Sequence, residues 1–186
     1  MKITIVTSNA GKAREVAAFF GGLLEVDHVA LDIPEYRSND IAEIAREKVR
    51  YAYDQLKIPL IVDDTGFFID ALKGFPGPYA AYILNSIGNA GILKLMDGVS
   101  YRNARFTTGI AYADEYGIEV FTGTLEGKIA LSPRGTNGFG YDPIFEIGVK
   151  TLAECSPEEK SRISHRARAL SSFHDWFIVQ RGKNQG

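Results

Sequence analysis

The segment Leu60–Gly66 limits what this chain can fold into more than any other part of the sequence. Three apolar residues are followed there by two adjacent acids, Asp63 and Asp64, and by a Thr-Gly pair. The apolar run predicts a buried strand, and the Thr-Gly pair predicts a turn directly after it. Two carboxylates about 4 Å apart repel each other by roughly 4 kcal/mol at an effective dielectric constant of about 20, so a partly buried pair needs a cation or a shared proton. The local sequence leaves two interpretations open, a divalent metal site and a simple turn capped by one of the acids.

The length and composition predict one globular domain over residues 1–186. The chain has 186 residues, of which 45% are hydrophobic and 11% aromatic. This is enough for one well-packed domain and too little for two independent ones. The net charge of -2 argues against a binder of duplex nucleic acid, because such proteins need a basic surface to displace counterions from phosphates. A single nucleotide needs only a few cations and is not excluded.

The sequence carries no sign of export or membrane insertion. Its one cysteine, Cys155, cannot form an internal disulfide, which fits a reducing compartment. The segment Met1–Thr7 is too short and too soon polar for a signal peptide. No apolar run approaches the roughly 20 residues that a membrane-spanning helix needs. We therefore expect a cytoplasmic protein with no membrane partner.

An anion site is predicted at the first turn of the chain. Residues 2–7 form a predicted strand, Ser8–Lys12 a tight polar turn, and the residues up to Phe20 a helix. Such a turn directs backbone N–H groups and the positive end of the helix dipole at one point, and the charge of Lys12 adds to them. The segment lacks the Gly and the Ser or Thr of a Walker A loop. A polar helix cap by Ser8 or Asn9 is the simpler alternative.

A further acid, Glu35, lies in the loop before the next predicted helix. Asp40 and Glu43 predict the start of that helix as a capping box. Apolar residues at helical spacing predict that one face of the helix packs on a sheet. They are Ile41, Ile44, Ala45, Val49, Ala52 and Leu56. Taken alone, Glu35 is a solvated surface acid.

A long hairpin and a glycine-rich loop follow. Arg105–Tyr112 and Ile118–Glu126 have the pattern of two paired strands. In residues 135–145, three glycines alternate with aromatic residues. This pattern suits a loop whose backbone approaches a planar ligand, with Phe139 or Tyr141 as the stacking face. Glycine-rich turns are often only turns, so this loop decides nothing by itself.

The C-terminal part predicts two helices with polar residues at their junction. Ser156 begins the first helix as a cap, and Lys160 lies within that helix. His165 and Arg166 precede the last helix, whose apolar face includes Phe173. A histidine beside an arginine at such a junction, away from any apolar stripe, favours a ligand contact.

Five segments, in this order over nearly the whole chain, resemble the inosine triphosphate pyrophosphatase family. They are Thr7-Ser8-Asn9-Ala10-Gly11-Lys12, Glu35, Asp63-Asp64-Thr65-Gly66, Gly138-Phe139-Gly140-Tyr141-Asp142-Pro143, and Lys160 with Ser164-His165-Arg166-Ala167. Each segment alone is common, whereas the ordered set is specific. The resemblance implies an α/β fold in which a long mixed β-sheet is flanked by helices, with two lobes around a nucleotide cleft, and a homodimer. It also implies hydrolysis of ITP, dITP or XTP to the monophosphate and pyrophosphate with Mg²⁺, which removes deaminated purines from the nucleotide pool.

The resemblance also implies a role for each residue of the site. The metal ligands would be Glu35 and Asp64, and Asp64 would be the base that activates water, with Asp63 as its substitute. The nucleotide would be bound by Thr7, Ser8, Asn9, Ala10, Gly11 and Lys12 around the triphosphate, by Thr65 and Lys160 beside it, and by Phe139, Gly140, Tyr141, Asp142, His165 and Arg166 around the base. Donors such as Arg166 would favour 6-keto purines over adenine, since a buried unpaired polar group costs about 1–3 kcal/mol.

Two other functions remain open. A regulatory protein would bind the nucleotide without turnover, although binding alone does not require Glu35 together with Asp63 and Asp64. A related pyrophosphatase would act on a pyrimidine or another modified nucleotide. The products formed from a set of nucleotides distinguish these possibilities.

Overall fold

The computed structural model describes residues 2–183 of the chain, and side chains as far as Gln180. Its strands are β1 (Lys2–Val6), β2 (Glu25–Val29), β3 (Leu60–Ile69), β4 (Pro76–Gly77), β5 (Asn103–Asp114), β6 (Gly117–Ile129), β7 (Phe145–Ile147) and β8 (Lys150–Thr151). Its α-helices are α1 (Ala10–Phe20), α2 (Ile41–Leu56), α3 (Ala80–Leu95), α4 (Pro157–Ile163) and α5 (His165–Lys183). Three short 3₁₀ helices, Asp70–Leu72, Asp142–Ile144 and Leu152–Glu154, lie in the connections.

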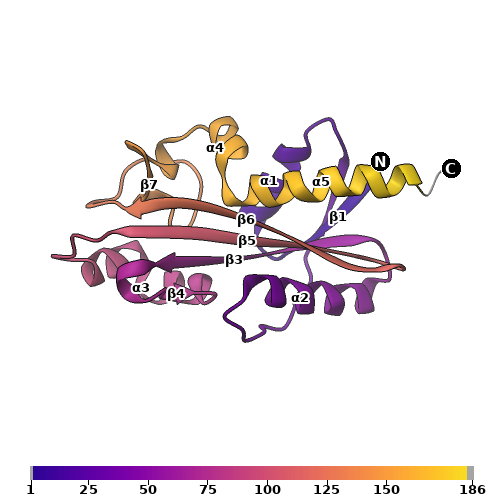
Figure 1. Ribbon diagram of the computed structural model, residues 1–186, viewed down its shortest axis with the longest axis horizontal. Helices are drawn as coiled ribbons and strands as arrows, with labels where there is room; N and C mark the ends of the chain where they lie inside the picture. Colours follow the sequence, from indigo (N-terminus) through magenta and orange to yellow (C-terminus); the bar gives the residue numbers. More distant parts are fainter. Residues whose placement is uncertain (1, 184–186) are drawn as a thin grey trace.

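One mixed sheet runs through the molecule. The strand order is β2-β1-β3-β5-β6-β7-β8, with β4 attached to β3. β1 is parallel to β2 and β3, whereas the remaining pairs are antiparallel. The long strands β3, β5 and β6 give the molecule its elongated shape (Figure 1). The predicted α/β class with a long mixed sheet flanked by helices is confirmed, and so is the hairpin, which is longer than predicted because β5 and β6 pair from Asn103 to Asp114.

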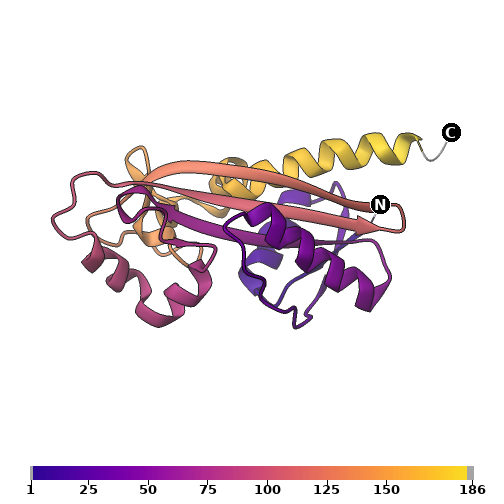
Figure 2. The ribbon, with the colours of Figure 1, turned by 60° about the horizontal axis from the view of Figure 1, so that its bottom comes forward.

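Helices cover both faces of the sheet at the end that carries β1 and β2 (Figures 1 and 2). On one face, Phe20 of α1 and Phe173 and Phe177 of α5 pack on Ile5 and Tyr112 of the sheet. On the other face lies α2, whose stripe contacts the alternate side chains of β3 and β5. The buried residues of α2 are those of the predicted stripe, Ile41, Ile44, Ala45, Val49 and Ala52.

The start of α5 lies directly on the backbone of β6. A Cβ atom at Gly123 would lie 2.2 Å from the carbonyl oxygen of His165. Only glycine allows the helix to approach the strand so closely. This contact places His165 and Arg166 over the middle of the sheet.

The opposite end of the sheet has its own apolar cluster, built from β3, β5, β6, β7 and α3. Phe67, Phe106 and Phe145 pack there against Ile92 of α3. The spacing of apolar residues in the sequence predicts two short helices here, Ala80–Ile87 and Ala90–Met96, and α3 indeed consists of two helical stretches that meet at a kink. Gly88 causes the kink, because its φ of 64° is outside the helical range.

β3 differs from the prediction. The strand does not end in a Thr-Gly turn after the two acids but continues through Thr65 and Gly66 to Ile69. β5 pairs with it over the whole length, and this row of hydrogen bonds outweighs the local turn preference. Asp63 and Asp64 therefore lie within a strand.

The predicted helix caps are confirmed with one change. Ser156 and Glu159 form the capping box of α4. Asp40 caps α2 by accepting from the N–H of Ala42, but Glu43 accepts from the hydroxyl of Ser38 instead of closing a box. Among residues 2–183, no helix combines the length and apolarity that crossing a membrane requires.

Candidate active site

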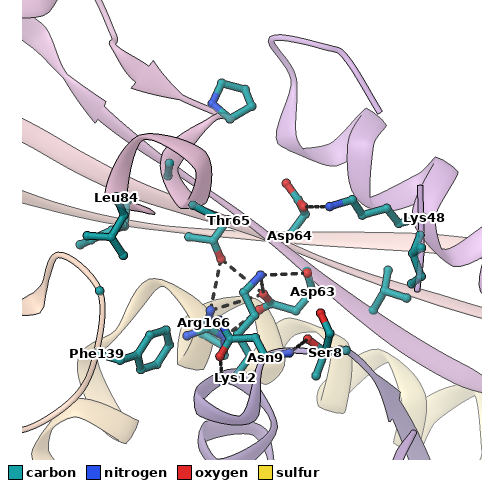
Figure 3. Close-up of a pocket in the computed structure, with 18 of the residues that line it drawn as sticks. Ser8, Asn9, Lys12, Lys48, Asp63, Asp64, Thr65, Leu84, Phe139 and Arg166 are labelled. Atoms are coloured by element: carbon teal, nitrogen blue, oxygen red, sulfur yellow. Dashed lines mark hydrogen bonds and ion pairs between the residues drawn. The ribbon is translucent and has the colours of Figure 1, made fainter. Parts of the chain in front are cut away.

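A pocket of about 310 Å³ opens where the edge of β3 changes partners. On this edge, β1 pairs with residues 60–62 and β4 pairs with Phe67 and Phe68, so residues 63–66 lie between the two partners. The lining comes from both ends of the sheet (Figure 3). Of the predicted site residues it includes Thr7, Ser8, Asn9, Lys12, Glu35, Asp64, Thr65, Phe139, Gly140, Tyr141, Asp142, Lys160, His165 and Arg166. Ala10 and Gly11 lie next to this set, in the first turn of α1.

Asp63 and Asp64 point to opposite faces of β3, because successive side chains of a strand alternate. Asp63 points toward α1 and α5 and meets Lys12 and Arg166. Asp64 points toward α2 and meets Lys48 (Figure 3). The expectation that these buried acids need a cation is confirmed, but the acids do not face each other as a pair, since each carboxylate has cations of its own.

Asp63 is a buried anion held by two cations. Its Oδ1 lies 2.5 Å from Lys12 Nζ, and its Oδ2 accepts from Arg166 Nε at 2.7 Å. Burial raises the pKa of Asp63, but Arg166 and Lys12 outweigh burial and hold this pKa well below its usual value. A carboxylate so strongly stabilised in its charged form is a weak base. The geometry thus disfavours Asp63 as a substitute for Asp64.

Asp64 and Glu35 converge on one cation, the ammonium group of Lys48. Lys48 Nζ lies 2.7 Å from Asp64 Oδ1 and 2.9 Å from Glu35 Oε2. Asp64 is buried, whereas the side chain of Glu35 is 86% exposed. Burial raises the pKa of Asp64, and Lys12 and Lys48 offset this effect only in part. The two predicted metal ligands, from separate segments, are therefore brought within reach of one positive charge.

The first turn of α1 is capped and still presents N–H groups to the pocket. Asn9 Oδ1 accepts from the backbone N–H groups of Gly11 at 2.9 Å and Lys12 at 3.1 Å. Within the part of the chain that the structure describes, the N–H groups of Ser8 and Ala10 have no such acceptor. The interpretation of Asn9 as a helix cap is therefore confirmed. The anion site stays a prediction, and the positive end of the helix dipole lies at the pocket, as that prediction requires.

The glycine-rich loop presents Phe139 to the pocket and keeps the ring of Tyr141 in the core. The ring centroid of Phe139 lies 4.7 Å from Lys160 Nζ. Tyr141 is 4% exposed, stacks on Phe67 with ring centroids 4.4 Å apart, and donates its hydroxyl to the carbonyl oxygen of Ala80. The interpretation of Tyr141 as a stacking face is therefore wrong, because its ring is already packed in the core. Phe139 is the aromatic face that remains.

Asp142 connects this loop to α4. Its Oδ2 accepts from the N–H of Phe139 at 2.8 Å and from Lys160 Nζ at 2.5 Å. Burial raises the pKa of Asp142, and Lys160 offsets this in part. Asp142 thus fixes the positions of an aromatic ring and a cation that both line the pocket.

His165 and Arg166 are buried at the start of α5. Arg166 Nη2 donates to Thr65 Oγ1 at 3.2 Å, and Thr65 Oγ1 lies 2.7 Å from Thr108 Oγ1. His165 Nδ1 lies 2.5 Å from the same hydroxyl of Thr108. Burial and the charge of Arg166 hold the pKa of His165 well below its usual value, so the imidazole is neutral near pH 7.

A model of the Ham1 family matches residues 3–176. The chain belongs to the Ham1 family. It is 48% identical over 183 residues to a dITP/XTP pyrophosphatase of Methanopyrus kandleri, covering 95% of this chain and 96% of the relative. It is 43% identical over 182 residues to inosine triphosphate pyrophosphatase 1 of Trypanosoma cruzi, covering 96% and 93%. The solved structure of a HAM1 protein from Coxiella burnetii matches with a TM-score of 0.83 and 31% identity, covering 96% of this chain and 99% of that one. The resemblance to the inosine triphosphate pyrophosphatase family is confirmed.

Three residues of this Ham1 site were not predicted from the sequence. Lys48 lies on the apolar stripe of α2, and a charge on such a stripe is a usable signal. Glu15 follows Lys12 by three residues, so the two share one side of α1. Thr108 is placed by its pairing with Thr65 across β3 and β5, and no local pattern marks it.

Proposed function

We propose that this protein hydrolyses ITP, dITP and XTP to the monophosphate and pyrophosphate, with Mg²⁺ as its metal. The observation that carries the proposal is the division of charge in the pocket. Asp64 and Glu35 meet around one cation, Lys48, on one side, and the cations Lys12, Lys160 and Arg166 lie elsewhere in the lining. A triphosphate with a divalent cation has the complementary division of charge. The names of the relatives, dITP/XTP pyrophosphatase and inosine triphosphate pyrophosphatase, support the substrate class.

Glu35 and Asp64 fit a metal ion as a pair of oxygen ligands. Burial lowers the pKa of Lys48, yet the two carboxylates outweigh it and raise this pKa, so their position stabilises a cation. Mg²⁺ typically takes one or two carboxylates from a nucleotide enzyme and the remaining ligands from phosphates and water. Among residues 2–183 no group of three or more His, Cys, Asp or Glu is placed to hold a metal, which fits a site that the substrate completes. The metal, when bound, would neutralise charge on the triphosphate.

Asp64 is the base in this proposal. Its raised pKa improves a carboxylate as an acceptor of a proton near neutral pH. Lys48 holds Oδ1, so Oδ2 is the oxygen that takes the proton of the attacking water. As the water oxygen bonds to phosphorus, the bond to the departing pyrophosphate breaks. Lys12 and Lys160 stabilise the negative charge that develops on that group.

Selection of the base follows from donors and an aromatic face. A 6-keto purine presents an acceptor where adenine presents an amino donor, so an N–H of Arg166 pairs with the first and not with the second. An unpaired buried donor costs about 1–3 kcal/mol, which is roughly a 5- to 150-fold preference. Phe139 supplies the stacking surface.

We also propose a homodimer. The turn that contains β4 and the following helix expose several large apolar side chains. They are Phe75, Tyr79, Tyr82 and Ile87. Exposed patches of this kind favour protein–protein contact. Light scattering of the purified chain would give twice the monomer mass, and the monomer mass would contradict the proposal.

The test of the enzymatic proposal is a product analysis with a panel of nucleotides. The purified chain is incubated with ITP, XTP, ATP, GTP and dTTP and Mg²⁺, and pyrophosphate and orthophosphate are measured separately. Pyrophosphate from ITP and XTP, with little from ATP, is the expected result. Orthophosphate would indicate removal of the terminal phosphate instead. No release, despite binding, would indicate a regulatory nucleotide binder.

A further inference from the structure

Two cations of the pocket share a carboxylate that stands outside the pocket lining. Glu15 Oε1 lies 2.6 Å from Lys160 Nζ, and Glu15 Oε2 accepts from Arg166 Nη1. Lys160 and Arg166 line the pocket, whereas Glu15 is absent from the described residues of that lining. Glu15 therefore holds both cations without facing a bound nucleotide.

Arg166 has little donor capacity left. A guanidinium carries five N–H hydrogens. Among the described residues, Nε donates to Asp63, Nη2 donates to Asp63 and to Thr65, and Nη1 donates to Glu15. These four bonds leave one hydrogen, and it is on Nη1. Because Glu15 binds the other hydrogen of Nη1, Glu15 fixes the direction of the one donor that Arg166 can offer.

Lys160 also has only one N–H hydrogen left for a ligand. An ammonium group has three N–H hydrogens in a tetrahedral arrangement. Two of its directions are taken, by Asp142 at 2.5 Å and by Glu15 at 2.6 Å. The remaining hydrogen is thereby fixed as well. One carboxylate on α1 thus orients one free donor on α4 and one on α5.

The charges around Glu15 explain why an acid is needed there. Lys160 and Arg166 are buried, with side chains 7% and 2% exposed, so each requires an acid next to it. Asp142 is the acid next to Lys160, and Asp63 is the acid next to Arg166. Asp63 also pairs with Lys12. Glu15 supplies the charge that is otherwise missing.

We propose that Glu15 is a positioning residue for substrate selection, which aims the last free N–H groups of Lys160 and Arg166 into the pocket. This rests on the proposed function, since those two donors would meet the nucleotide. A residue in this role affects how well the correct nucleotide binds. It leaves the proton transfer at Asp64 on the other side of β3 unchanged.

The test compares Glu15→Gln with a matched control in KM and kcat for ITP and ATP. Glu15→Gln keeps the shape and removes the charge, so one amide hydrogen would face a cation. We expect KM for ITP to rise about 10-fold or more and the preference for ITP over ATP to fall by about 10-fold, the range of one charge-assisted hydrogen bond. Because Lys160 also stabilises the departing pyrophosphate, kcat should fall by a similar factor for ITP and for ATP. Glu158→Gln removes the same charge from an exposed position of α4 and should leave all three values unchanged.

Glu15→Asp gives a second measurement in case the Gln variant does not fold, as judged by circular dichroism. Aspartate keeps the charge but is one methylene too short to reach both cations, so it should also raise KM for ITP. A folded Gln variant with the wild-type KM and preference, or an Asp variant with the wild-type KM, would overturn the proposal. So would a loss confined to kcat. If the wild-type chain releases no pyrophosphate, the proposed function fails. The Kd of ITP, measured by calorimetry, then decides the role of Glu15. Weaker binding of ITP by Glu15→Gln supports that role, and an equal Kd overturns it.

Discussion

Asp63 and Asp64 are neighbours in the chain, yet their carboxylates lie on opposite faces of β3 and pair with different cations. Asp63 is held by Lys12 and Arg166, and Asp64 by Lys48. Their pKa values move in opposite directions, down for Asp63 and up for Asp64. The alternation of a strand thus places two identical side chains in different surroundings, which suit the structural role of Asp63 and the chemical role that we propose for Asp64.

Asp64→Asn should abolish turnover and keep the fold. Removing a general base typically costs about 10²- to 10⁴-fold in rate, and the substitution changes neither volume nor apolar packing. Initial rates of pyrophosphate release from ITP measure the loss, and circular dichroism checks the fold. Activity near the wild-type level in a folded variant would contradict the role assigned to Asp64.

Asp63→Asn should lower the free energy of unfolding. It leaves the buried guanidinium of Arg166 and the ammonium of Lys12 without their shared anion, and breaking a buried ion pair typically costs about 3–5 kcal/mol. Chemical denaturation gives the free energy of unfolding. A free energy equal to that of Asp64→Asn would show that the two acids are equivalent, against the geometry.

Glu35→Gln should weaken metal binding. In the proposed site the exposed carboxylate supplies one of two charged oxygen ligands, and its loss should raise the Mg²⁺ concentration for half-maximal effect about 10-fold, which is about 1.4 kcal/mol. Thermal shift during a Mg²⁺ titration in the presence of nucleotide measures this without requiring turnover. Glu47→Gln, at a position of α2 whose side chain is 41% exposed, is the control. Equal titration curves for Glu35→Gln and Glu47→Gln would remove Glu35 from the metal site.

His165 should make the fold less stable in acid. Its pKa is lower in the folded chain than in the unfolded chain, so below about pH 6.5 the unfolded chain binds more protons. The free energy of unfolding therefore falls as pH falls, by up to about 1.4 kcal/mol per pH unit. His165→Asn keeps an acceptor for Thr108 and cannot titrate. Its free energy of unfolding should fall less between about pH 7 and about pH 5.5 than that of the wild type, by roughly 1 kcal/mol; parallel pH profiles would argue against a neutral buried imidazole.

Phe139→Ala and Tyr141→Phe should have different effects. Phe139→Ala removes the stacking face and should raise KM for ITP by about 5- to 100-fold, since stacking on an aromatic ring contributes about 1–3 kcal/mol per base. Tyr141→Phe removes only the hydrogen bond to Ala80 and should cost about 1 kcal/mol of stability, with KM unchanged. Steady-state kinetics and chemical denaturation of both variants measure the two effects. An increase of KM in Tyr141→Phe alone would reverse the assignment.

The sequence by itself determined the elements whose information is local. The apolar stripe of α2, the caps formed by Asp40 and Ser156, and the long hairpin are as predicted. Each depends on side-chain periodicity or on contacts within a few residues, which a sequence displays directly. The ordered motifs also predicted many of the side chains that line the pocket.

Only the tertiary structure decided which partners those residues have. The continuation of β3 past Asp64 depends on β5, about forty residues further along the chain. The burial of Tyr141 depends on Phe67, and the bridge from Glu15 to Lys160 and Arg166 joins α1 to the two last helices. Pairing register and the sharing of buried charge arise between distant segments. A local pattern contains neither, which is why the partners of each charged group became known only when the chain was folded.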